Sequence, residues 1–252
     1  MRARAVVPLL LSVAVTASSA VAAPPVVAVD PSPLRPDIGM LPPKDFSIQS
    51  RPRGVRWLRF DSVVVNVGPG AFDVYGQAAG ADGTRSVMQR LQDGSGGWVE
   101  VASPARMFFA GDGHNHWHVR DLQDWTIARL NDPASVLRRG AKTGFCFWDN
   151  YDYTATGPIV YHPSTTSACM QAANGTVPMG LSVGWGDEYP SLIAFQYIDI
   201  TGLPNGDYLV TLEADLANEF VEQDEENNAG WATIRIKRKA VIVLSTGTDL
   251  EP

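Results

Sequence analysis

Short runs of β-branched and apolar residues, separated by glycine and proline, recur along most of the chain. Residues 55–67 and 71–75 form two such runs, and a Gly-Pro-Gly sequence separates them. Residues 85–91 and 98–101 flank a second turn-forming sequence, Gly-Ser-Gly-Gly at 94–97. Because apolar runs of this length between turn formers are typical of strands, the pattern predicts antiparallel hairpins.

The second half of the chain continues this pattern. We expect strands at residues 124–130, 144–149 and 193–200, with a long loop from about 150 to 184. The clearest pair is 207–216 with 231–237, in which apolar and polar side chains alternate. Convincing helical periodicity and internal repeats are absent from the sequence. The prediction is therefore an all-β fold, an antiparallel β-sandwich core with long irregular loops and little helix.

The N-terminal residues predict export. Residues 1–22 combine a basic start, an apolar run and an Ala-Val-Ala cleavage sequence, which together indicate a signal peptide. The apolar run is too short to span a membrane, and no later run is long enough. Residues 23–54 are rich in proline and predict an irregular arm or flexible lead before a domain at 55–252. We expect a secreted protein, extracellular or periplasmic, without a membrane span.

Charge and cysteine content indicate which partners the protein can have and whether it contains a disulfide. The formal net charge is −7, and it becomes −9 when the two arginines of the leader are removed. Such an acidic surface argues against nucleic acid as a partner and favours cationic ones. The two cysteines, Cys146 and Cys169, predict one disulfide in an exported chain; two buried thiols or a reactive thiol are the alternatives.

Three of the four histidines lie at alternate positions within five residues, His114, His116 and His118. Alternation places them on one face of a strand, where three imidazoles form a candidate metal site. Ligation by nitrogen alone favours Cu(II), with zinc as the second choice, and three protein ligands leave an open position. The alternatives are solvated histidines on a wet strand or neutral histidines in the core.

Strand geometry constrains this site. Residues four apart in a straight strand are separated by about 13 Å, whereas an imidazole and a metal bond together reach roughly 5 to 6 Å. One ion therefore binds all three rings only if the backbone bends, for which Gly111 and Gly113 provide freedom. Otherwise the ion uses two of the three. We expect all three ligands with a local distortion.

The loop at 217–229 is a second candidate cation site. Its five carboxylates repel one another unless water or a cation screens them. The carboxylate and amide residues of the loop include Glu219, Glu222, Asp224, Glu225, Glu226, Asn227 and Asn228. Oxygen ligands close together in sequence are suited to Ca²⁺. The sequence therefore leaves two readings, a solvated acidic tip or a structural calcium site.

Three blocks of the sequence together resemble the catalytic domain of the lysyl oxidase family, which are secreted copper amine oxidases. Residues 114–118 resemble the family's H-x-H-x-H copper motif, and 140–146 its G-x-K-x-x-F-C segment. Residues 180–201 resemble the segment that carries the family's cofactor tyrosine. By motif position, Lys142 and Tyr189 are then the partners that form lysine tyrosylquinone, the electrophile that an amine oxidase needs.

The resemblance also implies a calcium site and identifies departures from the family. Residues 222–228 match an E-x-D-x-x-N-N segment, and Pro36-Asp37-Ile38 matches its partner near the domain start. The implied calcium ligands are Asp37, the carbonyl of Ile38, Glu222, Asp224, Asn227 and Asn228.

Few cysteines set this chain apart from animal members and suggest a divergent, bacterial-type member. Trp125 stands where the family has a histidine implicated in activity. The proton transfer that this histidine assists would be performed here by Asp149, Asp152 or His162, or by no residue.

Two classes of function follow from these observations. The leading hypothesis is a copper- and quinone-dependent amine oxidase, which converts lysyl side chains or small primary amines to aldehydes. It would consume O₂ and release hydrogen peroxide and ammonia. Its cofactors would be Cu²⁺, the quinone formed from Lys142 and Tyr189, and Ca²⁺. The alternative is a non-catalytic, secreted metal-binding β-sandwich module or a copper-binding protein.

Overall fold

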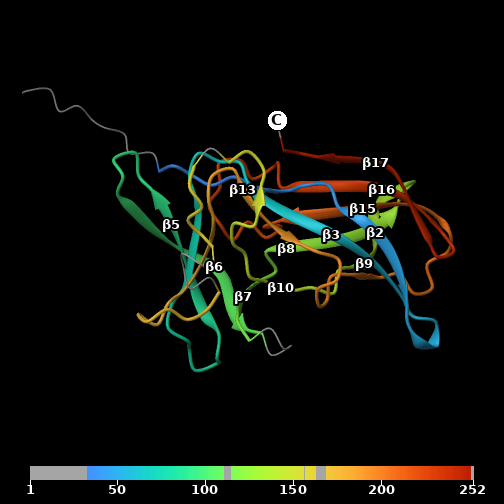
Figure 1. The fold of residues 1–252 in the computed structure, drawn as a ribbon, viewed down its shortest axis with the longest axis horizontal. Coiled ribbons are helices and arrows are strands. Elements are labelled where there is room, and N and C mark those ends of the chain that lie inside the picture. Colours follow the sequence, from blue (N-terminus) through green and yellow to red (C-terminus); the bar gives the residue numbers. More distant parts are fainter. Residues whose placement is uncertain (1–32, 111–114, 156, 163–168, 251–252) are drawn as a thin grey trace, which may run out of the picture. The chain divides into compact units, whose positions relative to one another are not determined.

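Three antiparallel sheets form the structure, a computed structural model that describes residues 33–110, 115–155, 157–162 and 169–250 (Figure 1). Within the described residues, the only helical element is the short 3₁₀ turn η1 (Pro52–Gly54). None of the described helical structure has the length and apolarity needed to cross a bilayer. The predicted all-β, antiparallel fold with little helix is confirmed.

The first sheet is built around the long strand β3. Its path is β1-β3-β13-β11, and β2 and β14 pair with β3 outside this path. Tyr189 pairs with Ser62 at one end of the β13–β3 ladder. The strands are β1 (Ile38–Met40), β2 (Lys44–Ser50), β3 (Arg56–Asn66), β11 (Tyr151–Asp152), β13 (Trp185–Tyr189) and β14 (Ile198–Asp199).

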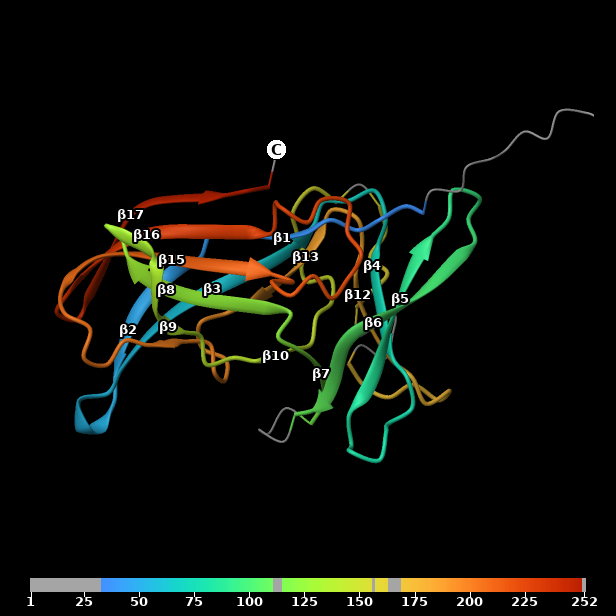
Figure 2. The same ribbon diagram turned by 180° about the vertical axis from the view of Figure 1, so that it is seen from behind.

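The second sheet carries the histidine segment. Its order is β10-β7-β6-β5-β4-β12, so the short strand β7 lies between β6 and β10 (Figure 2). The strands are β4 (Phe72–Gly76), β5 (Arg85–Gln92), β6 (Trp98–Phe109), β7 (Trp117–Arg120), β10 (Gly144–Phe145) and β12 (Val177–Leu181).

The third sheet has the order β17-β16-β15-β8-β9. The predicted pairing of 207–216 with 231–237 is confirmed, with Thr211 opposite Trp231 in the β15–β16 ladder. The strands are β8 (Gln123–Arg129), β9 (Asp132–Arg139), β15 (Gly206–Ala214), β16 (Ala229–Lys237) and β17 (Ala240–Thr248).

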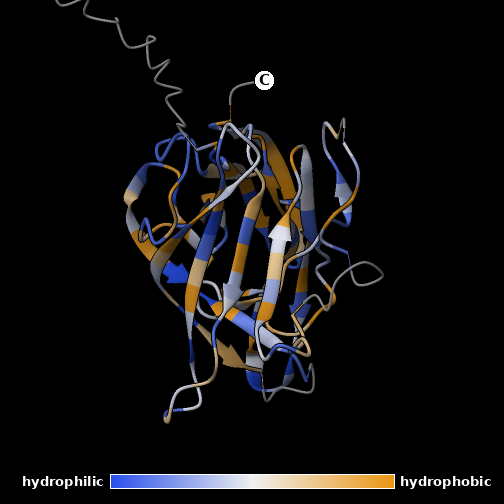
Figure 3. Ribbon diagram, turned by 90° about the vertical axis from the view of Figure 1, so that its left-hand side faces the viewer, coloured by the Kyte–Doolittle hydropathy of each residue, from blue (hydrophilic) through white to orange (hydrophobic). Residues whose placement is uncertain are grey.

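One hydrophobic core connects the three sheets. Apolar and polar residues alternate along several strands, as the bands of colour in Figure 3 show, and the apolar ones are buried. Leu58 of the first sheet, Met107 of the second and Val210 of the third belong to the same cluster of buried residues. Burial of apolar surface is the main force that stabilises such a core.

Several sequence expectations differ from the structure. The arm at 23–54 was expected to be irregular, but it contains β1 and β2, because backbone pairing with β3 needs no side-chain periodicity. The strands expected at 144–149 and 193–200 shrink to two residues each, and the expected loop at 150–184 contains β12. Short apolar runs in these places pack as loops against the core.

The two cysteines form a disulfide, as predicted, with a Cα–Cα distance of 5.7 Å between Cys146 and Cys169. Both residues are buried. The bond closes a chain segment across a sequence separation of 23 residues. A closed loop of this length restricts the unfolded chain, which stabilises the folded state by about 3 kcal/mol in the chain-entropy model.

Replacing both cysteines by alanine should lower the free energy of unfolding by about 3 kcal/mol, because the unfolded chain regains its loop entropy. Urea unfolding of the variant and the wild type measures this difference. Wild-type protein unfolded with a reductant present serves as the control and should give a similar value. A loss below about 1 kcal/mol would contradict the expectation.

Candidate metal and cofactor site

The histidine segment forms the connection between β6 and β7. His118 lies on β7 opposite Phe108 and is buried, whereas His116 precedes the strand and is half-buried. Asn115, directly before His116, has a φ of +52°, so the backbone departs from the extended conformation of a strand at this residue. The predicted local distortion is therefore present in the described residues. His114 lies outside the described residues, so its predicted ligation stays a prediction.

The two described imidazoles meet at their Nε2 atoms, which are 2.8 Å apart. This distance is that of a hydrogen bond between the two rings. Because both Nε2 atoms point to the same place, the two rings are arranged so that one metal ion could replace the shared proton and bind both.

Gly144 has no side chain, and this leaves space for the His118 ring. A Cβ atom at this position would lie 2.7 Å from His118 Nδ1 and 2.5 Å from Phe108 Cζ. Gly144 belongs to β10, which pairs with β7 over two residues. The glycine in the Lys142 segment therefore allows the close approach of the histidine segment.

Lys142 and Tyr189 are brought together, although they are far apart in sequence. The Lys142 Nζ atom lies 5.3 Å from the centroid of the Tyr189 ring and 5.2 Å from that of Phe145. Lys142 lies in the loop before β10, and Tyr189 ends β13. Small movements of a lysine side chain in a loop are sufficient to bring Nζ to the edge of the ring.

His116, His118, Lys142 and Tyr189 all line one cavity of about 330 Å³. Its other described lining residues are mostly apolar, with two carboxylates and one amide among them. They are Cys146, Trp148, Asn150, Asp187, Glu188, Pro190 and Ile193. A concave, mainly apolar site with few converging polar groups is the usual form of a small-molecule site.

Burial and charge affect the acidity of Tyr189. Its hydroxyl donates a hydrogen bond of 2.7 Å to the carbonyl oxygen of Cys146. Burial raises the pKa of the Tyr189 phenol well above its usual range, and the neighbouring Asp187 carboxylate raises it further. An ionised Tyr189 would therefore need a positive charge nearby to stabilise it.

Trp125 takes no part in the lining of the cavity. Its side chain is buried in the core, with its ring 5.2 Å from Phe60 and 5.8 Å from Phe145. Phe145 in turn packs edge-on against Tyr189 at 5.6 Å. Trp125 thus packs behind Phe145, which contacts Tyr189. It does not provide a proton-transfer group in place of the histidine that the resemblance implies for this position.

Sequence reasoning missed three polar residues of the cavity, Asp187, Glu188 and Asn150. Strand alternation carried a usable signal for the first, because Asp187 is two residues from Tyr189 and hence on the same face of β13. Asn150 offered no such signal, since it reaches the cavity only through the tertiary arrangement of its loop.

Three of the six predicted calcium ligands line a second cavity. Asp37, Asp224 and Asn227 line a space of about 650 Å³. The side-chain oxygens Oδ1 of Asp37, Asn227 and Asn228 are buried and have no hydrogen-bond partner among the described residues. Unsatisfied buried oxygens are costly, and a hard cation such as Ca²⁺ would satisfy them.

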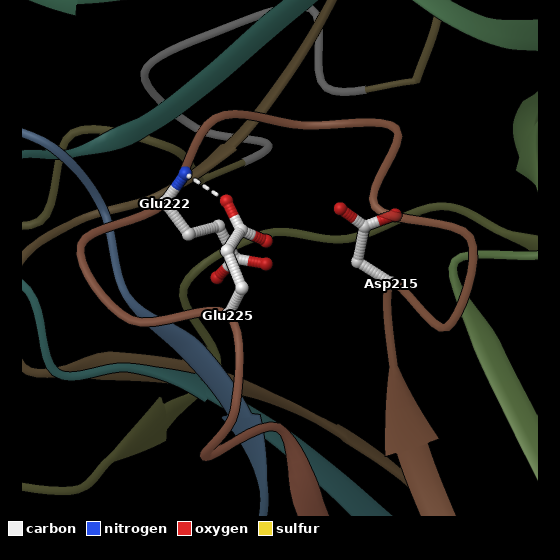
Figure 4. A group of neighbouring side chains, drawn as sticks. All are labelled: Asp215, Glu222 and Glu225. Carbon is white, nitrogen blue, oxygen red and sulfur yellow. Dashed lines mark hydrogen bonds between the residues drawn. The ribbon is translucent and has the colours of Figure 1, made fainter.

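Glu222 lies at the side of this cavity and has other partners. Its carboxylate accepts a hydrogen bond of 2.6 Å from the backbone N–H of Ile38 and one of 3.1 Å from Asn228. Asp215 and Glu225, which are not among the predicted calcium ligands, come within 4.8 Å of Glu222, ligand atom to ligand atom (Figure 4). Burial raises the pKa of Glu222 to about 9 and that of Asp215 to about 6.

A family comparison covers the part of the chain that contains the candidate site. The sequence model of the lysyl oxidase family matches residues 101–246, which is more than half of the chain. The matched range contains the histidine segment, Lys142, Tyr189 and the acidic loop. A search of curated proteins found no match.

Substituting Gly144 by alanine should destabilise the protein by about 1 to 3 kcal/mol, because the new Cβ overlaps His118 and Phe108. It should also weaken copper binding, since the His118 ring has to move. Urea unfolding and a copper titration measure the two effects. Gly94→Ala is the matched control, as nothing lies within 4 Å of a Cβ there; equal effects in both variants would contradict the packing argument.

The raised pKa of Glu222 predicts how stability depends on pH. A carboxyl whose pKa is about 9 in the folded state and ordinarily 4.5 stabilises the fold fully below about pH 4.5. This contribution is lost as the pH rises towards 9, by at most about 1.4 kcal/mol per pH unit. Metal-free protein should therefore be less stable at pH 8 than at pH 6, measured by urea unfolding.

Glu222→Gln should reduce this pH dependence, because the amide does not ionise. Glu226→Gln, on the exposed part of the same loop, should leave it unchanged. Calcium should raise stability at pH 8 in the wild type, since a cation favours the ionised carboxylates. The same pH dependence in wild type and Glu222→Gln would show that this carboxyl is not its source.

Proposed function

Because the chain belongs to the lysyl oxidase family, we propose that it is a secreted copper- and quinone-dependent amine oxidase. It would convert primary amines, either lysyl side chains or small amines, to aldehydes with the consumption of O₂ and the release of hydrogen peroxide and ammonia. The family match itself supports the coarser statement, an oxidoreductase of the copper amine oxidase type.

One observation carries the finer proposal. The Lys142 Nζ atom is 5.3 Å from the centroid of the Tyr189 ring, inside the cavity that His116 and His118 also line. A solvated lysine and a packing tyrosine have no reason to share a buried cavity with two imidazoles. Lys142 is itself only 8% exposed, so its side chain lies inside the protein beside the Tyr189 ring rather than in solvent.

The residues of the cavity have distinct roles in this proposal. His114, His116 and His118 would bind Cu²⁺, and Lys142 and Tyr189 would be joined as lysine tyrosylquinone. The quinone, when formed, supplies the carbonyl that reacts with the substrate amine and accepts its electrons. The Cys146 carbonyl orients the Tyr189 hydroxyl, and the edge of Phe145 fixes the plane of the ring. Trp148, Pro190 and Ile193 provide apolar walls that limit the access of water.

Substrate charge and location follow from the rest of the molecule. The net charge of −7 favours the approach of cationic amines. The disulfide is consistent with an oxidising compartment, as expected for an exported protein. The signal peptide at 1–22 lies outside the described residues and stays part of the proposal, as does the assignment of 55–252 as the catalytic domain.

We further propose that Ca²⁺ binds where β1 meets the acidic loop. Asp37, Asp224, Asn227 and Asn228 offer oxygens there, and the carbonyl of Ile38 and Glu222 complete the proposed set. Supporting this are the three buried oxygens without a partner among the described residues. The ion would be structural, because it lies in a cavity that shares no lining residue with the one around Tyr189.

Copper-loaded, aerated protein should contain a covalent link between Lys142 and Tyr189, because Nζ is close to the ring and copper with O₂ supplies the oxidation. Peptide mapping by mass spectrometry detects the link, and phenylhydrazine detects the carbonyl as a coloured adduct. We expect close to one adduct per chain. Separate, unmodified peptides in copper-replete protein would contradict the amine oxidase and favour the metal-binding module.

Two variants serve as controls for this experiment. Lys142→Arg keeps the positive charge but should not form the link, and it should still bind copper. His116→Ala should lose copper binding and link formation together, because each imidazole supplies a ligand. Stoichiometric copper in His116→Ala would contradict the role of this residue as a ligand.

A further inference from the structure

Oxidation of an amine by the proposed cofactor needs a base that no residue has yet supplied. A hydrogen on the carbon next to the amine nitrogen must leave as a proton, and a positioned base typically contributes 10²- to 10⁴-fold to such a step. The sequence offered Asp149, Asp152 and His162 as substitutes for the histidine that Trp125 replaces. The structure permits each of them to be tested for position.

None of these three residues is placed to act as the base. Asp149 already accepts hydrogen bonds of 2.7 to 3.2 Å from the backbone N–H groups of Val160, Tyr161 and Ser182 and from the Ser182 hydroxyl. Asp152 is exposed on β11 and accepts a bond from the N–H of Ala155. Neither Asp152 nor His162 is among the described residues that line the cavity.

Asp187 has the position that the other three lack. It lies on β13 two residues before Tyr189, so both side chains are on the same face of the strand and both line the cavity. The carboxylate is 2% exposed. The side-chain amide of Asn150 donates a hydrogen bond to Oδ1, whereas Oδ2 is buried without a hydrogen-bond partner among the described residues.

The two oxygens of this carboxylate therefore differ in function. The bond from Asn150 to Oδ1 fixes the orientation of the group, and Oδ2 is buried beside the Tyr189 hydroxyl, so the carboxylate lies next to the reacting ring. A buried carboxylate oxygen without a donor is costly in a purely structural role, where evolution or packing usually supplies a partner. Such an oxygen beside the reacting ring is instead suited to accept a proton from a bound substrate.

We propose that Asp187 is the general base that removes the proton from the carbon next to the substrate nitrogen. This inference rests on the proposed amine oxidation. In this step the C–H bond breaks, the proton passes to Oδ2 of Asp187, and the electron pair passes to the cofactor. O₂, the oxidant of the proposed reaction, takes up two electrons in the later reoxidation and leaves as hydrogen peroxide.

The environment of Asp187 suits this task. Burial raises the pKa of the Asp187 carboxyl well above its usual range, although the neighbouring Tyr189 hydroxyl, the hydrogen bond from Asn150 and the charge of Lys142 oppose this rise. A carboxylate with a raised pKa accepts a proton more readily than a solvated one. The other titratable groups that face the cavity are His116, His118, Lys142, Glu188 and Tyr189.

Asp187→Asn tests the proposal, because the amide has nearly the same shape but accepts no proton. Copper-loaded, aerated variant is treated with phenylhydrazine, whose reaction with the carbonyl breaks no C–H bond. It is then mixed without oxygen with n-butylamine, and the reduction of the cofactor is followed by absorbance. We expect a normal amount of adduct but a reduction at least about 100-fold slower than in the wild type. Asp152→Asn is the matched control and should reduce at the wild-type rate.

The outcomes of this experiment distinguish a failure of the role of Asp187 from a failure of the proposed amine oxidation. An Asp187→Asn reduction rate within about tenfold of the wild type, with a full amount of adduct, overturns the role of Asp187 and leaves the amine oxidase intact. Wild-type protein without any adduct overturns the proposed function, and this inference with it. In the wild type, n-butylamine deuterated next to the nitrogen should react several-fold more slowly, since the C–H bond breaks in the step assigned to Asp187.

Two further variants, Asp187→Glu and Asp187→Ser, test the proposal if Asp187→Asn fails to form the cofactor. Asp187→Glu keeps a carboxylate and should form the adduct and retain more than about a tenth of the wild-type reduction rate. Asp187→Ser, which has the cavity space but no base, should form the adduct and not be reduced. Equal rates in these two variants overturn the proposal.

A measurement on metal-free protein tests the placement of the carboxylate independently of activity. Phenol ionisation is followed by ultraviolet absorbance in wild type and Asp187→Asn, and the signal of Tyr189 is identified by its loss in Tyr189→Phe. Removing the neighbouring negative charge should lower the pKa of Tyr189. An unchanged pKa would show that the carboxylate does not lie beside the ring, and would overturn the proposal.

Discussion

The disulfide between Cys146 and Cys169 joins the three segments that carry the candidate chemistry. Cys146 follows β10, shortly after Lys142, and its carbonyl oxygen accepts a hydrogen bond from the Tyr189 hydroxyl. The carbonyl of Cys169 accepts a hydrogen bond of 2.8 Å from the backbone N–H of Trp117, between the two described histidines. One covalent bond therefore connects the lysine, the tyrosine and the histidine segment. The short β7–β10 ladder, with two residue pairs, could not fix this arrangement alone.

Buried oxygens without partners mark both parts of the molecule to which we assign a ligand. Near Tyr189 a single oxygen, Oδ2 of Asp187, lies in a cavity wall and is suited to accept a proton. Around Asp37 several oxygens converge, which is suited to a cation with many oxygen ligands. One acceptor matches the proton transfer proposed for Asp187, and a cluster of oxygens matches the Ca²⁺ proposed beside β1, because a proton needs one acceptor and Ca²⁺ needs six or more.

The cluster of carboxylates also links the two ends of the described chain. The N–H of Ile38 in β1 donates to Glu222, and the N–H of Met40 donates to the carbonyl of Asn228. These contacts place β1, β3 and the strands β15 and β16 in one arrangement. Without a cation, the raised pKa values of Glu222 and Asp215 record the cost of bringing buried carboxyls together. A bound ion would convert that cost into stability.

The sequence by itself determined the residue types of the chemistry and the class of the fold. The spacing of His114, His116 and His118, the block around Lys142 and the acidic loop were recognisable as motifs, because each depends on residues close together in the chain. Strand alternation likewise predicted β15 and β16, because the period of two is local. Only the tertiary structure decided which groups meet, namely Lys142 with Tyr189, Asn150 with Asp187, and β1 with Glu222. Their contacts span 37 to 184 residues, and such distant pairings arise from core packing and burial, which no local pattern encodes.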